Sequence, residues 1–137
     1  MSRILSIDYG KKRTGIAVTD PLQIIANGLV TVATCDLMDF LTGYVAKEDV
    51  ECIVVGNPKQ LNGQPSENQQ RVHQFVEKWK RQSAIPVVYY DERFTSVLAH
   101  KAMLEGGLKK KKRQDKALVD EISATIILQD YLSQKNR

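Results

Sequence analysis

Residues 4–19 read Ile-Leu-Ser-Ile-Asp-Tyr-Gly-Lys-Lys-Arg-Thr-Gly-Ile-Ala-Val-Thr. The aliphatic runs at 4–7 and 16–19 predict two strands, and the glycine and lysine residues between them predict a hairpin turn. Asp8 stands at the end of the first run, although Asp is depleted in strands and an unpaired buried carboxylate is costly. A turn-capping role would explain this acid, and so would a functional site.

The length and the cysteines place the chain in a broad class. Its 137 residues are enough for one domain with its own core, and we expect a single domain over residues 1–137. Cys35 and Cys52 lack the spacing of a zinc site, which favours a reducing compartment. No apolar run approaches the ~18 residues of a membrane span. We therefore expect a soluble, cytoplasmic protein that does not associate with membranes.

The positive charge is concentrated in one segment. The chain has 20 basic and 16 acidic residues, a net charge of +4. Five of the basic residues are consecutive: Lys109, Lys110, Lys111, Lys112 and Arg113. Such a run is either a solvated loop or a contact for nucleic-acid phosphates, where each contact releases counterions.

The rest of the pattern alternates between strands and helices. Further strands are predicted at 24–32, 52–55 and 86–90, and helices that begin near residues 36, 66, 95 and 115. Thr34 or Asp36 could cap the first helix. Helices between the later strands imply parallel pairing, whereas the opening strands imply an antiparallel meander. We predict an α/β fold with a mixed five-stranded sheet flanked by helices.

Acids end two of the predicted strands, the first at Asp8 and the last at Asp91 and Glu92. In open α/β sheets the carboxyl ends of strands line one crevice, so these acids could face the same site. Side chains alternate along a strand, so at most one of Asp91 and Glu92 points with Asp8. A strand that ends in Gly56 would lie between them and leave room for a metal ion or a phosphate.

The last helix offers candidates for a third acid: Asp115, Asp120 and Glu121. Apolar residues occupy most of the circumference of this helix, so its periodicity does not choose among the three. Any one of them could equally be a solvated surface acid.

Four motifs closely resemble the YqgF/RuvX family, in order and from end to end of the chain. They are Ile7-Asp8-Tyr9-Gly10-x-Lys12-Arg13-Thr14-Gly15-Ile16-Ala17, Val54-Val55-Gly56-x-Pro58, Asp91-Glu92-Arg93-Phe94-Thr95-Ser96 and Asp120-x-x-Ser123-Ala124. Asn57 before Pro58 and Ser123 are small departures. The resemblance implies a ribonuclease H-like nuclease domain that processes the 5′ end of pre-16S rRNA, with Holliday junction resolvase as the older assignment. Carried over by position, it implies the acidic triad Asp8, Glu92 and Asp120.

Three carboxylates without His or Cys suit the hard cation Mg²⁺, or Mn²⁺, and two such ions about 4 Å apart can activate water for phosphodiester hydrolysis. We therefore expect a metal-dependent hydrolase in which the triad holds the metal. Lys12, Arg13 and Arg93 adjoin the acids and could hold phosphates or form surface salt bridges. The basic run precedes the helix that carries Asp120, which favours its contact with a bound nucleic acid.

Other functions are compatible with these residues. A phosphate-binding ATPase-like half domain has a similar Asp-x-Gly hairpin, although such proteins need two domains to enclose a nucleotide. A catalytically idle RNA-binding assembly factor would need no Mg²⁺. Within the nuclease hypothesis the substrate is open between structured RNA, such as pre-16S rRNA, and branched DNA. A four-way junction favours a dimer, whereas a monomer or weak homodimer can trim RNA.

Overall fold

The computed structural model describes residues 2–57, 67–91 and 116–135. Its elements are β1 (Arg3–Asp8), β2 (Arg13–Thr19), β3 (Ala26–Ala33), the 3₁₀ turn η1 (Thr34–Asp36), α1 (Leu37–Lys47), β4 (Val50–Asn57), α2 (Glu67–Gln82), β5 (Val87–Asp91) and α4 (Lys116–Lys135). The helix predicted from residue 95 and the basic run at 109–113 lie outside the described residues. Within the described ranges, no helix is long and apolar enough to cross a membrane.

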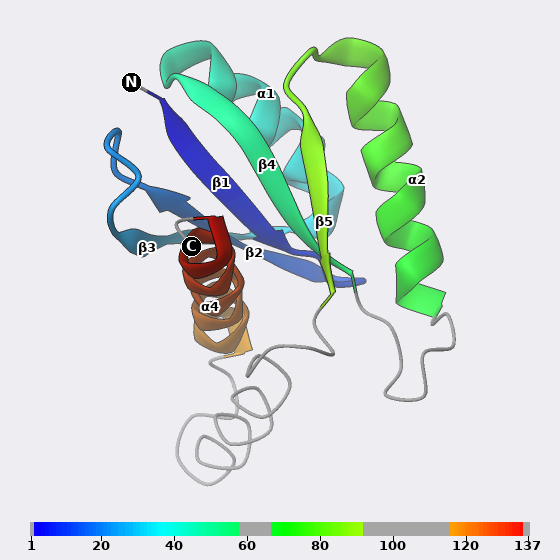
Figure 1. The fold of residues 1–137 in the computed structure, drawn as a ribbon. Helices are drawn as coiled ribbons and strands as arrows, with labels where there is room; N and C mark the ends of the chain where they lie inside the picture. The colour runs from blue at the N-terminus through cyan, green and yellow to red at the C-terminus, as the bar shows by residue number, and fades with distance from the viewer. Residues whose placement is uncertain (1, 58–66, 92–115, 136–137) are drawn as a thin grey trace, which may run out of the picture.

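The five strands form one mixed sheet in the order β3-β2-β1-β4-β5 (Figure 1). β3, β2 and β1 pair antiparallel as a meander, whereas β1, β4 and β5 pair in parallel. This confirms the predicted sheet, including β4 as the strand between β1 and β5. The carboxyl ends of β1, β4 and β5 therefore meet at one edge of the sheet.

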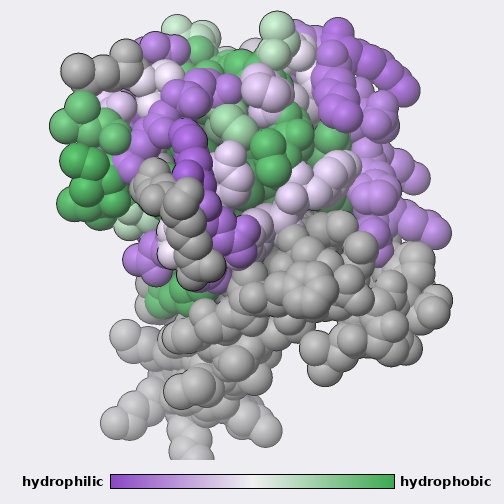
Figure 2. Space-filling model, viewed as in Figure 1, coloured by the Kyte–Doolittle hydropathy of each residue, from purple (hydrophilic) through white to green (hydrophobic). Residues whose placement is uncertain are grey.

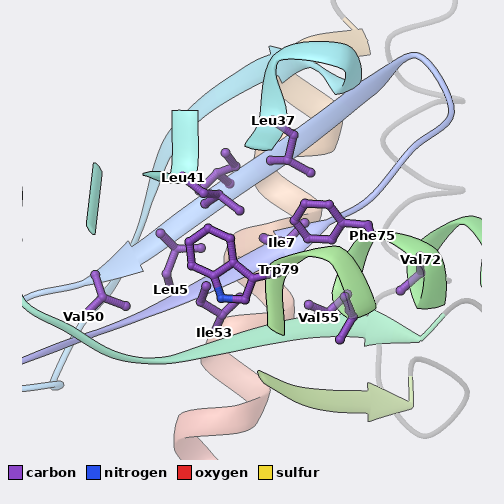
Figure 3. Close-up of a cluster of buried hydrophobic side chains, with 12 residues drawn as sticks. Leu5, Ile7, Leu37, Leu41, Val50, Ile53, Val55, Val72, Phe75 and Trp79 are labelled. Carbon is purple, nitrogen blue, oxygen red and sulfur yellow. The ribbon is translucent and has the colours of Figure 1, made fainter. Parts of the chain in front are cut away.

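Helices α1 and α2 cover one face of the sheet and bury its larger apolar cluster. Leu41 of α1 and Trp79 of α2 point into this cluster together with Leu5 and Ile7 of β1 (Figure 3). The apolar stripe predicted for α2 is buried in full: Val72, Phe75, Val76 and Trp79. The period of three and four in the sequence thus identified the inward face of this helix.

Helix α4 covers the opposite face (Figure 1). Ile4 of β1 belongs to one buried cluster with Ala124 and Leu128 of α4, and the Ser6 hydroxyl donates a hydrogen bond of 2.6 Å to the Ala124 carbonyl. Successive residues of a strand point to opposite faces. β1 therefore presents Ile4, Ser6 and Asp8 to α4.

Two glycines of the sheet make room for α4 and its side chains. A Cβ atom at Gly15 of β2 would overlap the carbonyl group of Asp120 and would lie 2.8 Å from the backbone nitrogen of Glu121. A Cβ atom at Gly28 of β3 would lie 2.5 Å from Oε1 of Glu121. A side chain at Gly15 would push the helix backbone away, so this position needs glycine for close backbone approach, whereas a side chain at Gly28 would displace the Glu121 side chain.

The loop between β2 and β3 differs from the prediction. The third strand begins at Ala26, not at Ile24, because the Asp20 carboxylate accepts backbone hydrogen bonds from Ile25, Ile24 and Leu22 at 2.7–3.0 Å and folds this stretch into a loop. These bonds, chiefly that from Ile25, hold the pKa of Asp20 below its ordinary value. The loop exposes Leu22, Ile24 and Ile25 as an apolar projection (Figure 2).

The predicted cap of α1 is also corrected. Asp36 occupies the N-cap position, but its side chain makes no capping hydrogen bond to the described part of α1. The Thr34 hydroxyl instead donates to the Gly10 carbonyl in the β1–β2 turn. Thr34 therefore serves the hairpin next to Asp8 and not the helix that follows it.

The substitution Gly15→Ala tests the close approach of α4. The added methyl group meets backbone atoms of Asp120 and Glu121 that cannot rotate away, so we expect the free energy of unfolding in urea to fall by about 1–3 kcal/mol. Gly43→Ala is the matched control, because a Cβ atom there meets nothing within 4 Å. In α1 this change should stabilise by up to about 1 kcal/mol. Equal stability of the two variants would contradict the proposed crowding.

Candidate active site at the end of β1

Asp8 lies at the carboxyl end of β1 and is 6% exposed. Its partner in the antiparallel ladder with β2 is Gly15. Side chains of directly paired residues in antiparallel strands share a face. The face of Gly15 is the one against α4, so the buried carboxylate of Asp8 is directed to the α4 side, as the alternation of Ile4 and Ser6 also requires.

Asp120 borders the same glycine from the helix side. Its carbonyl group lies where a side chain of Gly15 would be. Asp8 and Asp120, which are 112 positions apart in the sequence, thus both adjoin Gly15. The structure brings together two of the three acids that the resemblance implied.

An ion pair fixes the direction of Asp120. Nε of Arg13, at the start of β2, lies 3.0 Å from Oδ2 of Asp120 and donates a hydrogen bond to it. The side chains are 40% and 20% exposed, respectively. Arg13, for which the sequence allowed a phosphate contact or a salt bridge, thus forms a salt bridge with the acid on α4. Lys12, its neighbour, is exposed on the turn.

Glu121 is directed elsewhere. Its side chain lies against Gly28 of β3, one strand further from β1 than Gly15. The rotation of α4 on the sheet thus puts Asp120 beside Gly15 and Glu121 against Gly28, whereas the periodicity of the helix did not separate the two acids. Asp115, the third candidate, lies outside the described residues.

The neighbouring strand β4 contributes space to this edge of the sheet. Cys52 and Val54 belong to the cluster under α4, so alternation puts Gly56 on the same face as Asp8. Gly56 is buried and has no side chain to occupy that face. Tyr90 of β5 is in the same cluster, which makes β5 the third strand that reaches this edge on the α4 side.

Several predicted site residues lie outside the described residues: Glu92, Arg93, Lys109, Lys110, Lys111, Lys112 and Arg113. Over 2–57, 67–91 and 116–135, no three His, Cys, Asp or Glu side chains are close enough together to hold a metal ion. The described part of the site is therefore a pair of acids with one arginine.

The β1–β2 turn is contacted by residues that the sequence did not single out for it. Thr34 and Asn68 both donate side-chain hydrogen bonds to its carbonyl groups. Burial raises the pKa of the Tyr9 phenol, and the positive charge of Arg71 opposes this shift, so Arg71 lies near the turn as well. Asn68 and Arg71 belong to the first turns of α2, and nothing in the sequence marked them as neighbours of this turn.

Solved structures share the architecture of the chain. The fowlpox virus resolvase in complex with Holliday junction DNA matches with a TM-score of 0.61 at 16% identity over 98% of this chain and 99% of that one. The RuvC protein of T. thermophilus in complex with a Holliday junction substrate matches with a TM-score of 0.57 at 16% identity over 98% and 96%. The mixed sheet of this chain is thus a ribonuclease H-like fold.

The chain belongs to the YqgF/RuvX family. The family model described as "RuvX: Holliday junction resolvase" matches residues 2–134. A protein of Phocaeicola vulgatus, named "Putative pre-16S rRNA nuclease", is 68% identical over 98% of both chains. Proteins of the same name in Bacteroides thetaiotaomicron and Porphyromonas gingivalis are 65% and 54% identical. Membership makes the chain a nuclease, a hydrolase that acts on nucleic acid.

A double-mutant cycle tests the ion pair between Arg13 and Asp120. Arg13→Ala, Asp120→Ala and the double variant should give a coupling of about 0.5–1 kcal/mol in the free energy of unfolding at low salt, since the pair is short and partly buried. The coupling should fall in 1 M NaCl, where charges are screened. Glu77 and Lys80 on α2 are the control pair, at 4.0 Å and more exposed, and should couple more weakly. A larger coupling energy for Glu77 and Lys80 than for Arg13 and Asp120 would contradict the stabilising role of the Arg13–Asp120 ion pair.

Proposed function

We propose that this protein is a Mg²⁺-dependent nuclease that processes the 5′ end of pre-16S rRNA, with Asp8, Glu92 and Asp120 as its metal ligands. The observation that supports the site is the position of Asp8 and Asp120 on either side of Gly15, on one face of the sheet. The observation that supports the substrate is the name shared by relatives at 54–68% identity over almost the whole chain.

The carboxylates of the described residues are ligands that suit a divalent cation. Asp8 and Asp120 offer hard carboxylate oxygens, which Mg²⁺ prefers, and both adjoin Gly15 on the α4 side of the sheet. Side chains return to the same face every second residue, and this supports Glu92, two positions after Tyr90, as the third ligand in preference to Asp91.

The metal, the acids that hold it and Arg13 would have different roles in phosphodiester hydrolysis. Bound Mg²⁺, as one or two ions, supplies an activated water and stabilises charge on the phosphate. The acids hold the metal at the edge where Gly56 leaves room for a phosphate group. Arg13 keeps Asp120 in place through its Nε and has other guanidinium donors that can reach a phosphate oxygen.

The second candidate is cleavage of four-way DNA junctions. The family description names Holliday junction resolvase, and both structural neighbours were solved with junction DNA. Their identity of 16% to this chain supports the fold and carries little weight for the substrate. RNA is therefore the substrate that we propose first, and the experiment below also offers the protein a four-way DNA junction. We expect a monomer or weak homodimer.

The decisive test offers purified full-length protein a pre-16S 5′ leader RNA and a synthetic four-way junction, with Mg²⁺ or EDTA. Wild type should cut the leader in Mg²⁺ only. Asp8→Asn should lower the rate by more than about a hundredfold, because even partners of metal ligands are worth 10–100-fold. Asp39→Asn, the same change on the exposed surface of α1, should leave the rate unchanged.

Three results would overturn the proposal. Equal cutting by Asp8→Asn, or by wild type in EDTA, would remove the metal site. Cutting of the junction alone would make the protein a resolvase. RNA binding that survives in EDTA without any cleavage would make it a non-catalytic assembly factor.

We further propose that Lys12, Arg93 and the basic run at 109–113 contact the phosphates of the substrate. Replacement of Lys110, Lys111 and Lys112 by Gln should weaken RNA binding and reduce the slope of log K against log salt by about 0.7 for each phosphate of single-stranded RNA that the variant no longer neutralises. Lys78, Lys80 and Arg81 near the end of α2 provide a control with the same change in charge. An equal loss of affinity in both variants would point to net charge alone.

A further inference from the structure

The turn that follows Asp8 is held from one side by a single threonine. The hydroxyl of Thr34 donates to the carbonyl of Gly10 at 2.7 Å, and its backbone N–H donates to the carbonyl of Lys12 at 2.9 Å. Because the hydroxyl proton is engaged in this way, the hydroxyl of Thr14, 2.9 Å away, is the donor to Oγ1 of Thr34. Thr34 thus ties both ends of the turn to the end of β3.

An asparagine holds the same turn from the helical layer. Nδ2 of Asn68 in α2 donates to the carbonyl of Tyr9 at 2.8 Å, and the ring of Tyr9 packs against Phe75 of the same helix at 5.6 Å. Oδ1 of Asn68 is buried and accepts no hydrogen bond within the described part of the chain. Asn68 thus connects α2 to the turn through the hydrogen bond that its amide donates to Tyr9.

We propose that Thr34 and Asn68 are positioning residues that set the direction of the Asp8 carboxylate. The ladder to Gly15 fixes the backbone before this carboxylate, and the three held carbonyls of Tyr9, Gly10 and Lys12 fix it afterwards. The inference rests on the proposed function, because it gives Asp8 the role of a metal ligand.

The coordination geometry of Mg²⁺ requires that the Asp8 carboxylate keep a fixed direction. This ion demands near-ideal octahedral geometry with ligand distances of about 2.0–2.1 Å, and a functional site tolerates displacements of only about 0.5 Å. A strand end followed by an unsupported glycine turn would not hold a carboxylate to that tolerance, since glycine has the greatest backbone freedom. Two side chains from separate elements remove this freedom.

A purely structural role makes a different prediction. If Thr34 and Asn68 only stabilise the hairpin, their removal lowers the free energy of unfolding and leaves the Mg²⁺ affinity of the folded protein unchanged. If they position Asp8, the affinity for Mg²⁺ falls, and cleavage recovers towards the wild-type kcat when Mg²⁺ is raised to saturation.

The experiment titrates full-length protein with Mg²⁺ by calorimetry, without substrate, and then measures cleavage against Mg²⁺ concentration. Thr34→Val, which keeps the shape of the side chain, and Asn68→Ala should each raise the Kd for Mg²⁺ about tenfold. Thr34→Ser keeps the hydroxyl and should bind Mg²⁺ as wild type does. Should Asn68→Ala fail to fold, the Thr34 pair still tests the proposal.

Matched controls remove similar hydrogen bonds elsewhere. Thr42→Val deletes a hydroxyl that donates to a backbone carbonyl in α1 at 2.8 Å. Gln23→Ala deletes an amide that donates at 2.9 Å to the carbonyl of Ser2, just before the opposite end of β1. Both variants should bind Mg²⁺ with the wild-type affinity.

The outcomes separate the two proposals. If wild type binds Mg²⁺, Asp8→Asn does not, and Thr34→Val and Asn68→Ala bind as wild type, the positioning role is wrong and the metal site stands. If Asp8→Asn binds Mg²⁺ as tightly as wild type, the metal site itself is wrong, and the positioning role falls with it. A weakened affinity in Thr34→Val that Thr34→Ser restores supports both.

Discussion

The close approach of α4 to β2 at Gly15 is the contact on which the site depends. It lets the backbone of Asp120 lie where a side chain would otherwise be, directly beside the strand position that pairs with Asp8. Each of the three meander strands contacts the helix in its own way: β1 through the Ser6 hydrogen bond to Ala124, β2 against the helix backbone at Gly15, and β3 against the Glu121 side chain at Gly28. The position of α4 along and across the sheet is therefore determined by polar and backbone contacts as well as by the apolar cluster beneath it.

The two faces of the sheet have different tasks. The face under α1 and α2 is closed by large apolar side chains such as Trp79 and Leu41, which is the ordinary source of stability in a domain of this size. The face under α4 also buries Ser6 and Asp8, which contribute no apolar area. Both residues belong to β1, so this face combines apolar packing with polar side chains of the strand that ends at the candidate site.

The sequence predicted what depends on local pattern and missed what depends on tertiary contact. The apolar stripe of α2 and the position of β4 beside β1 follow from periodicity and alternation, and both are confirmed. Threonine is a residue type that often caps helices. The hydroxyl of Thr34 instead donates a hydrogen bond to the Gly10 carbonyl in the hairpin turn, which lies within its reach. Asp120 and Glu121 are neighbours on a helix with apolar residues around most of its circumference. The packing of α4 on the sheet puts Asp120 beside Arg13 and Glu121 against Gly28 of β3, and this depends on contacts between elements that the helix sequence alone does not show.

A site of acids that acts on a polyanion has an electrostatic problem, and the arrangement around Asp120 bears on it. Uncompensated carboxylates would repel a phosphate backbone, so cations have to balance them before a substrate approaches. Arg13 balances the charge of Asp120, and the proposed metal would balance the charges of the acids that hold it. The remainder of the attraction has to come from outside this pair. Because the charge of the chain apart from residues 109–113 is close to neutral, the long-range attraction of a nucleic acid would come from that run in the proposed function. The acids and the basic run thus have separate tasks in the proposed function, the first for chemistry at one bond and the second for capture of the strand.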